Sequence, residues 1–179
     1  MWVLVSAWLL IFSGFDICVV WCDLRYRKVP NRLLIAGFGV QALWLLANGF
    51  FVLSLPTAWG VVVATHWSIA LATAGIVFVV LFPLWRFRAM GAGDVKFAAL
   101  LGFCMGPVGL LQAFIVGSLV AGVHSVLYFV QREVPWLLGP LGRHPVTRAT
   151  PYAAYLALGV LLGVVWQLAD GQPWLLRLA

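Results

Sequence analysis

Long apolar runs separated by short polar segments dominate this sequence. A transmembrane helix needs about 20 predominantly apolar residues. Runs of that kind predict helices at residues 2–22, 33–53, 61–84 and 151–169. A further apolar stretch covers residues 95–130, which is too long for one ordinary span and short for two. The pattern predicts an all-α, polytopic membrane protein in which the path of one stretch needs separate evidence.

That stretch contains the sequence GFCMGPVG, with Gly106 followed by Pro107. A Gly-Pro pair favours a turn. We therefore predict a tight reversal between two short helices, at roughly 95–111 and 113–130. This interpretation gives six transmembrane helices.

Basic residues gather in alternate loops of the six-helix scheme. With the N-terminus outside, the loops at 23–32, 85–94 and 131–150 face the cytoplasm, the side that Lys and Arg favour. These loops and their edges contain Arg25, Arg27, Lys28, Arg32, Arg86, Arg88, Lys96, Arg132, Arg143 and Arg148. Arg177 falls on the outer side. A single span at 95–130 would move three of the inner residues outside, so the bias supports six helices with the N-terminus outside.

Composition strengthens the membrane interpretation. The chain is 64% hydrophobic and 9% charged, whereas soluble domains contain about 25% charged residues. Because topology accounts for the net charge of +6, we expect the basic residues to meet anionic lipid headgroups and not nucleic acid. Three cysteines without paired spacing argue against a disulfide framework or a zinc site. The apolar N-terminus lacks a basic region and a cleavage motif, which predicts a retained helix. We expect a single domain over residues 1–179.

Five carboxylates stand out in so apolar a chain. Glu133 and Asp170 fall in predicted loops or tails, where solvation accounts for them. Asp23 ends the first predicted helix and Asp94 opens the fourth, with two spans between them. The topology therefore places both at the cytoplasmic edge of the membrane. A helix cap explains Asp94 alone, and an ion pair with a neighbouring Arg or Lys explains Asp23 alone. Together they point to function, because ionisable groups at this depth are costly.

Two facing carboxylates can hydrolyse an amide. Like charges about 3 Å apart cannot both ionise, so such a pair shares one proton. The ionised partner takes a proton from water while the protonated partner polarises the carbonyl. This chemistry requires no metal and no cofactor, and we expect neither. A catalytic triad is not favoured, because His66 and His144 fall at opposite sides of the membrane.

Several segments resemble one family. GAGD, ending at Asp94, fits the G-x-G-D motif of intramembrane aspartyl proteases. DLRYRKVPN, starting at Asp23, resembles the segment that carries the first catalytic Asp of prepilin peptidases. GDVKFAALLG and TPYAAYLALG are similar to the continuation of the second motif and to the proline-led start of the last span. These pieces occur in the family's order over about residues 23–159.

The resemblance implies that Asp23 and Asp94 are the catalytic pair of a peptidase with its active site open to the cytoplasm. The family removes short basic leaders from type IV pilin-like precursors. Its larger bifunctional members also methylate the new N-terminus, and they carry a cytoplasmic insertion that often has paired cysteines. Only residues 24–32 separate the first two predicted helices here. The chain thus looks like the short peptidases of tight-adherence (Flp) pili, with archaeal preflagellin peptidases as the alternative.

Neighbouring residues acquire candidate supporting roles. Gly91 and Gly93 permit unusual backbone conformations, which would let a substrate strand approach Asp94 or let the segment move; a plain turn is the alternative. For Pro30 and Asn31 a structural role at the start of the second helix is favoured. Lys96 is two residues beyond Asp94 and so on another helix face; we favour a snorkelling or topology role over tuning of the Asp. Thr150 and Pro151 indicate a capped start for the last helix.

Asp16 precedes Asp23 by seven residues, which places it two helical turns away on nearly the same face, at about 10 Å. His124 falls at a comparable predicted depth. One hypothesis makes Asp16 a polar contact of the active-site cavity, paired with His124. The alternative is a protonated Asp packed between helices.

Two other classes of function compete with the peptidase. Paired carboxylates in a membrane can relay protons or bind cations in a transporter, which predicts acids at mid-membrane or staggered across it. A non-enzymatic subunit of a secretion machine is the third possibility. The shared cytoplasmic edge of Asp23 and Asp94 favours the peptidase.

Overall fold

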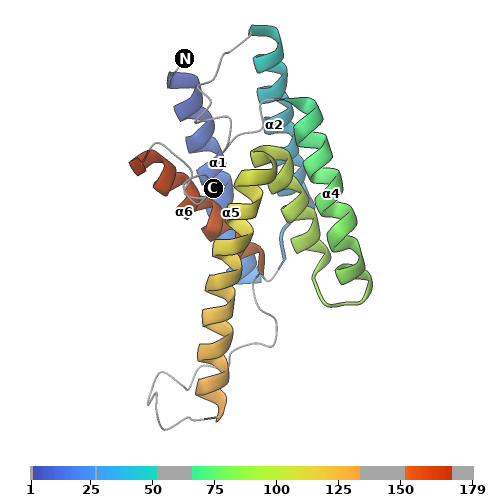
Figure 1. Cartoon of the computed structure of the whole chain (residues 1–179), viewed down its shortest axis with the longest axis vertical. Helices are drawn as coiled ribbons and strands as arrows, with labels where there is room; N and C mark the ends of the chain where they lie inside the picture. The colour runs from blue at the N-terminus through green and yellow to red at the C-terminus, as the bar shows by residue number, and fades with distance from the viewer. Residues whose placement is uncertain (1, 27, 52–65, 134–151, 171–179) are drawn as a thin grey trace.

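The computed structural model is built from α-helices (Figure 1). It describes residues 2–26, 28–51, 66–133 and 152–170. The helices are α1 (Trp2–Tyr26), α2 (Asn31–Phe51), α4 (Trp67–Arg86), α5 (Ala92–Glu133) and α6 (Tyr152–Asp170). They follow the predicted helices closely and confirm the all-α fold. Most of the predicted 131–150 loop, the Thr150-Pro151 helix start and the beginning of the predicted 61–84 helix lie outside the described residues.

Three of the described helical segments are long and apolar enough to cross a membrane, namely Ala7–Tyr26, Trp67–Arg86 and Ala92–Val130. Shorter apolar segments run over Asn31–Ala47 and Tyr152–Val165. The protein is therefore a membrane protein by the length and composition of its helices. The count of six spans and the outside position of the N-terminus stay predictions.

Helix α5 contains the predicted reversal. Gly106 has φ 70° and ψ −171°, a conformation outside the helical region that favours glycine. In Figure 1 the chain rises from the loop after α4 to this point and then descends along the longer half of α5. Pro107 follows directly, where its missing N–H does no harm at the start of a helix. The break falls at Gly106, several residues before the boundary predicted at 111–113.

The second half of α5 packs closely against α6. A Cβ atom added at Gly159 would lie 2.5 Å from the carbonyl oxygen of Ala113, and one added at Gly117 would lie 2.8 Å from that of Tyr155. Small residues spaced by four allow two helix backbones to approach in this way. The contact fixes the height and rotation of α6 relative to α5, and thereby the position of the first turn of α6.

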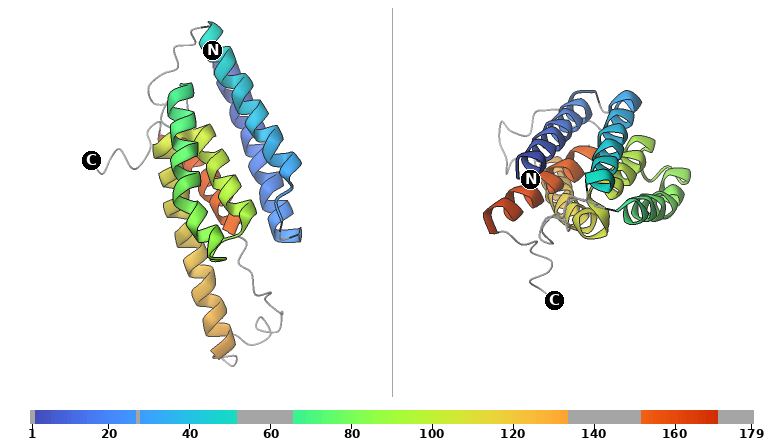
Figure 2. Two further views of the ribbon diagram at one scale, coloured as in Figure 1. Left: turned by 90° about the vertical axis from the view of Figure 1, so that its right-hand side faces the viewer. Right: turned by 90° about the horizontal axis from the view of Figure 1, so that it is seen from above.

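Helices α1 and α2 lie side by side against the other three helices (Figure 2). The side chain of Gln41, which is 1% exposed, joins this pair to α5. Trp8 Nε1 donates to Gln41 Oε1 at 3.1 Å, and Gln41 Nε2 donates to the carbonyl of Cys104 at 3.3 Å. The break at Gly106 takes regular helical donors away from the carbonyls before it. Gln41 satisfies one of these groups inside the protein.

Candidate active site

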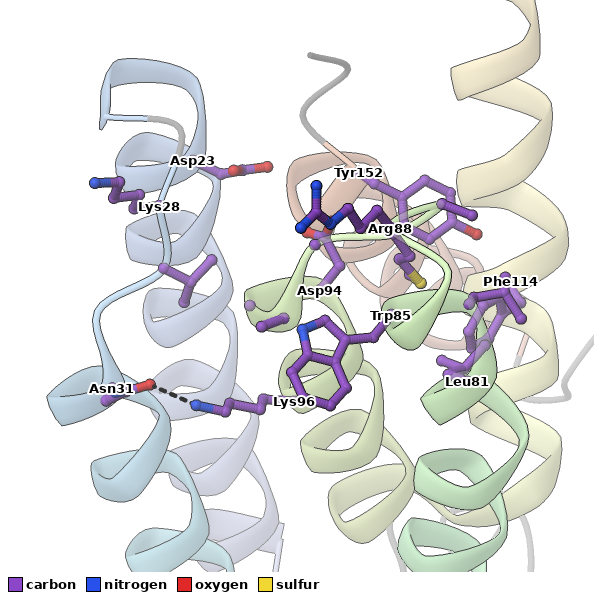
Figure 3. A pocket seen from close by; sticks show the side chains of 17 residues that line it. Asp23, Lys28, Asn31, Leu81, Trp85, Arg88, Asp94, Lys96, Phe114 and Tyr152 are labelled. Carbon is purple, nitrogen blue, oxygen red and sulfur yellow. Dashed lines mark hydrogen bonds between the residues drawn. The ribbon is translucent and has the colours of Figure 1, made fainter.

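A cavity of about 1060 Å³ opens where α1 ends and α5 and α6 begin (Figure 3). Its walls come from the end of α1, the segment leading into α2, the end of α4 with the following loop, and the first turns of α5 and α6. The predicted site residues Asp23, Asn31, Gly91, Gly93, Asp94 and Lys96 all line it. Pieces far apart in the sequence therefore meet in one opening.

Asp23 lies in the last turn of α1 and is 6% exposed. Its Oδ2 accepts a hydrogen bond from the backbone N–H of Ala154, at 3.0 Å. Ala154 belongs to the first turn of α6, whose N–H groups have no partners within the helix. The contact joins the predicted catalytic carboxyl of α1 to the start of the last helix.

Asp94 is the third residue of α5 and is half-buried. Gly91 precedes the helix, and its carbonyl accepts from Val95 N at 3.2 Å. The Asp94 carboxyl accepts backbone hydrogen bonds from Gly91 and Ala153. Asp94 thus reaches back to the capping residue from inside the first turn, and the N-cap itself is Gly91. The alternative that Asp94 caps the helix is therefore correct in that Asp94 takes part in the capped turn, but the N-cap residue is Gly91 and not Asp94.

The first turn of α6 contacts both carboxyls. Ala153 bonds to Asp94 and Ala154 bonds to Asp23. The N-terminus of a helix carries partial positive charge and exposed N–H donors, so it stabilises carboxylates placed there. Adjacent amides on one rigid helix hold the two acids in a fixed relation. These contacts of the last helix with the two acids were not predicted from the sequence, where the proline-led TPY segment is the available signal.

The two acids face one opening from different helices. Figure 3 shows the labelled side chains of Asp23 and Asp94 reaching from α1 and α5 toward the same space. They are close enough for the charge of Asp23 to act on Asp94. The arrangement is suited to acid–base hydrolysis of an amide by a carboxyl pair.

Lys96 and Asn31 lie at the same rim. Lys96 Nζ donates to Asn31 Oδ1 at 3.2 Å, and both residues are exposed. Asn31 is the first residue of α2, and the carbonyl of Pro30 accepts from Leu33 N at 3.0 Å. Pro30 and Asn31 therefore start α2, and Lys96 ties that start to the helix that carries Asp94. This contact was absent from the sequence interpretation.

Asp16 is placed differently from the hypothesis that paired it with His124. Asp16 is fully buried, it does not line the cavity, and neither of its carboxyl oxygens has a hydrogen-bond partner among the described residues. His124 Nδ1 lies 2.8 Å from Tyr155 Oη instead. The hypothesis was wrong because depth alone was compared, and the rotation of each helix decides which side chains meet. Asp16 is packed between helices, as the alternative held.

The two motif glycines differ in their surroundings. Neither has a positive φ; Gly106 is the glycine with one in the part of the chain that is described. A Cβ at Gly91 would lie 2.9 Å from Asp94 Oδ2, whereas one at Gly93 would meet nothing closer than Val29 N at 3.9 Å. Gly91 therefore provides space for the Asp94 carboxyl. The resting structure places no such demand on Gly93.

Alanine substitutions at Gly91 and Gly93 should therefore have different effects. Gly91→Ala forces the Asp94 carboxyl to shift, and we expect peptide cleavage by this chain to fall by about tenfold or more, as small displacements of catalytic groups do. Gly93→Ala fits without rearrangement, so we expect unchanged thermal stability. Cleavage rates and unfolding temperatures of both variants in detergent test this. Full activity of Gly91→Ala would contradict the role given to that space.

The chain is similar to known proteins over most of its length. The family model for the type IV leader peptidase family matches residues 10–126, which include both Asp23 and Asp94. A prepilin leader peptidase/N-methyltransferase of Bacillus subtilis is 24% identical over 158 residues, covering 87% of this chain and 54% of that protein. Its namesake from Xanthomonas campestris pv. campestris is 27% identical over 172 residues, covering 90% of this chain and 51% of that protein.

No solved structure matches the chain significantly. The chain spans about half the length of the curated relatives that it matches. The family match covers well over half of the chain and reaches from α1 into the second half of α5. On this evidence the chain belongs to the type IV leader peptidase family.

Proposed function

We propose that the chain is an aspartyl endopeptidase that removes the basic leader from Flp-type, type IV pilin-like precursors at the cytoplasmic face of the membrane. The observation that carries the proposal is the placement of Asp23 and Asp94 in one cavity, each bonded to the first turn of α6. Membership of the type IV leader peptidase family and the names of its curated relatives support the same reaction.

The reaction follows from a pair of carboxyls that holds one proton. A water molecule attacks the carbonyl carbon of the scissile bond and gives one proton to the ionised carboxylate. The protonated carboxyl donates to the carbonyl oxygen and stabilises the tetrahedral intermediate. When the C–N bond breaks, the proton taken from water passes to the leaving amine. The backbone N–H groups of Ala153 and Ala154 keep the two acids oriented through these steps.

The surroundings of the cavity support a substrate that enters from the cytoplasm. Lys28, Arg88 and Lys96 line the cavity, and basic residues favour the cytoplasmic side. A volume of about 1060 Å³ is at the upper end of ligand-pocket sizes, which suits a stretch of extended peptide. The ionised member of the carboxyl pair supplies negative charge that a basic leader would meet.

We propose further that the chain does not methylate its product. Residues 27–30 alone join α1 to α2, and the cytoplasmic insertion with paired cysteines is absent from this connection. If this is right, the new N-terminus of the cleaved precursor carries no added methyl group. Mass spectrometry of the mature N-terminal peptide distinguishes the two products, and a methylated terminus would contradict this part.

Cleavage itself is tested in a bacterial host that lacks its own prepilin peptidase. The chain is co-expressed with an Flp-type precursor, and leader removal is followed by gel mobility and N-terminal sequencing. A variant with both Asp23→Asn and Asp94→Asn, expressed at an equal level in the membrane, serves as the control. We expect processing with the wild type and none with the control. No processing of any pilin-like precursor by a well-inserted wild-type chain would overturn the proposal.

A further inference from the structure

Arg88 adopts a backbone conformation that arginine rarely takes. Its φ is 59°, and it is the one non-glycine residue with a positive φ among the residues that the structure describes. It follows Phe87, the C-cap of α4. Arg88 N donates to Trp85 O at 2.9 Å, and Ala89 N donates to Leu84 O at 2.8 Å. These two bonds form a Schellman motif, in which glycine is the usual residue at this position. A side chain there strains the backbone.

The strain is not explained by packing. Arg88 is exposed, so its side chain fills no gap in the core. No ion pair joins it to an acidic residue within the ranges that the structure describes. A positive charge that only fixed the topology would serve equally well two residues earlier, where Arg86 already lies within α4. Strained residues cluster at active sites and ligand-binding sites, which makes Arg88 a candidate for a functional role.

The side chain of Arg88 is directed into the cavity. Arg88 lines it together with Asp23 and Asp94. Figure 3 shows the guanidinium reaching past the loop, on the side that bears Asp94 and toward the space in front of Asp23. The left-handed backbone at Arg88 sets this direction, because it determines where the Cα–Cβ bond points. Arg86 is not part of the wall.

We propose that Arg88 is a substrate-binding residue whose guanidinium donates hydrogen bonds to an oxygen acceptor of the bound peptide, a main-chain carbonyl or a carboxylate. A guanidinium carries only donors and is well suited to such acceptors. It repels a basic leader, so its contact falls on the other side of the scissile bond. The inference rests on the proposed function, since it assigns a role within the same cavity.

Three substitutions separate binding from backbone effects. Arg88→Gln removes the charge and keeps a side chain in the strained position. Arg88→Gly removes the charge and relieves the strain. Arg88→Lys keeps the charge without the planar donor arrangement. Arg86→Gln, with the same loss of charge two residues away, is the matched control.

The purified variants are compared with the wild type on the Flp-type precursor in detergent. For Arg88→Gln and Arg88→Gly we expect kcat/KM to fall by about tenfold or more, mainly through KM, as for the loss of a hydrogen bond from a charged group. We expect Arg88→Lys to fall between these variants and the wild type, and Arg86→Gln to match the wild type. The unfolding temperature of Arg88→Gly should be equal to that of the wild type or higher, so that activity and stability move independently.

Precursors in which acidic side chains near the cleavage site are replaced by amides identify the acceptor. If they abolish the difference between the wild type and Arg88→Gln, the acceptor is a carboxylate; if the difference persists, it is a main-chain carbonyl. Wild-type kcat/KM in Arg88→Gly, or a fall in kcat alone, would overturn the inference. A wild-type chain that cleaves nothing contradicts the proposed function instead, so the two failures are distinguishable.

Discussion

Replacing Asp23 or Asp94 singly with asparagine is expected to lower leader cleavage by at least about a thousandfold, as for other catalytic groups that act as a unit. Asparagine keeps the size of the side chain but can neither accept a proton from water nor supply one to a carbonyl. Because the two carboxyls share the task, loss of either should cost nearly as much as loss of both. Single-turnover cleavage of the precursor by each variant measures the effect.

Asp16→Asn is the matched control for these variants. It makes the same chemical change on the same helix as Asp23, but Asp16 is buried away from the cavity. We expect it to insert and to cleave at close to the wild-type rate. A loss at Asp16 equal to that at Asp23 would mean that any change of charge in α1 is damaging, and full cleavage by Asp23→Asn or Asp94→Asn would exclude the aspartyl mechanism.

Gly159→Ala is expected to be the most damaging change outside the cavity. The added methyl would lie 2.5 Å from the backbone oxygen of Ala113, which cannot move without shifting α5. Overpacking of this kind costs about 1–3 kcal/mol of stability. It also pushes away the helix whose first turn bonds to Asp23 and Asp94. We therefore expect both a lower unfolding temperature and a loss of cleavage.

Gly163 provides the comparison, one helical turn further along α6. A Cβ added there meets nothing within 4 Å. Alanine has the higher helix propensity, so Gly163→Ala should leave cleavage unchanged and keep or raise the unfolding temperature. Equal effects of the two substitutions would show that the close contact of α5 with α6 does not position the site.

Much of this architecture follows from local sequence signals. The apolar runs gave the helices to within a few residues, and the Gly106-Pro107 pair predicted the reversal. Asp23 and Asp94 could be assigned to the same face of the membrane because two predicted spans lie between them, so that the chain crosses the membrane and returns. Each of these inferences uses only the order of residues along the chain.

Other features depend on how helices are rotated and paired. The hydrogen bonds from Ala153 and Ala154 involve backbone N–H groups, and the residue type does not indicate which backbone groups donate to a side chain. The Asp16–His124 hypothesis failed because depth without rotation does not define a contact. The left-handed backbone conformation of Arg88 could not be predicted either, because glycine is the usual residue at such a position and arginine is not. These features required the packed structure.

The reversal at Gly106 also bears on how water reaches the scissile bond. From Asp94 to the reversal the helix rises only about 18 Å, well short of the hydrocarbon thickness of about 30 Å. If the reversal reaches the outer boundary of the hydrocarbon layer, Asp94 lies inside that layer and not at its cytoplasmic boundary. The cavity of about 1060 Å³ is large enough to hold many water molecules. Under the six-span topology, the short half of α5 would therefore make the cavity a hydrated inlet in the membrane, through which water reaches the peptide bond.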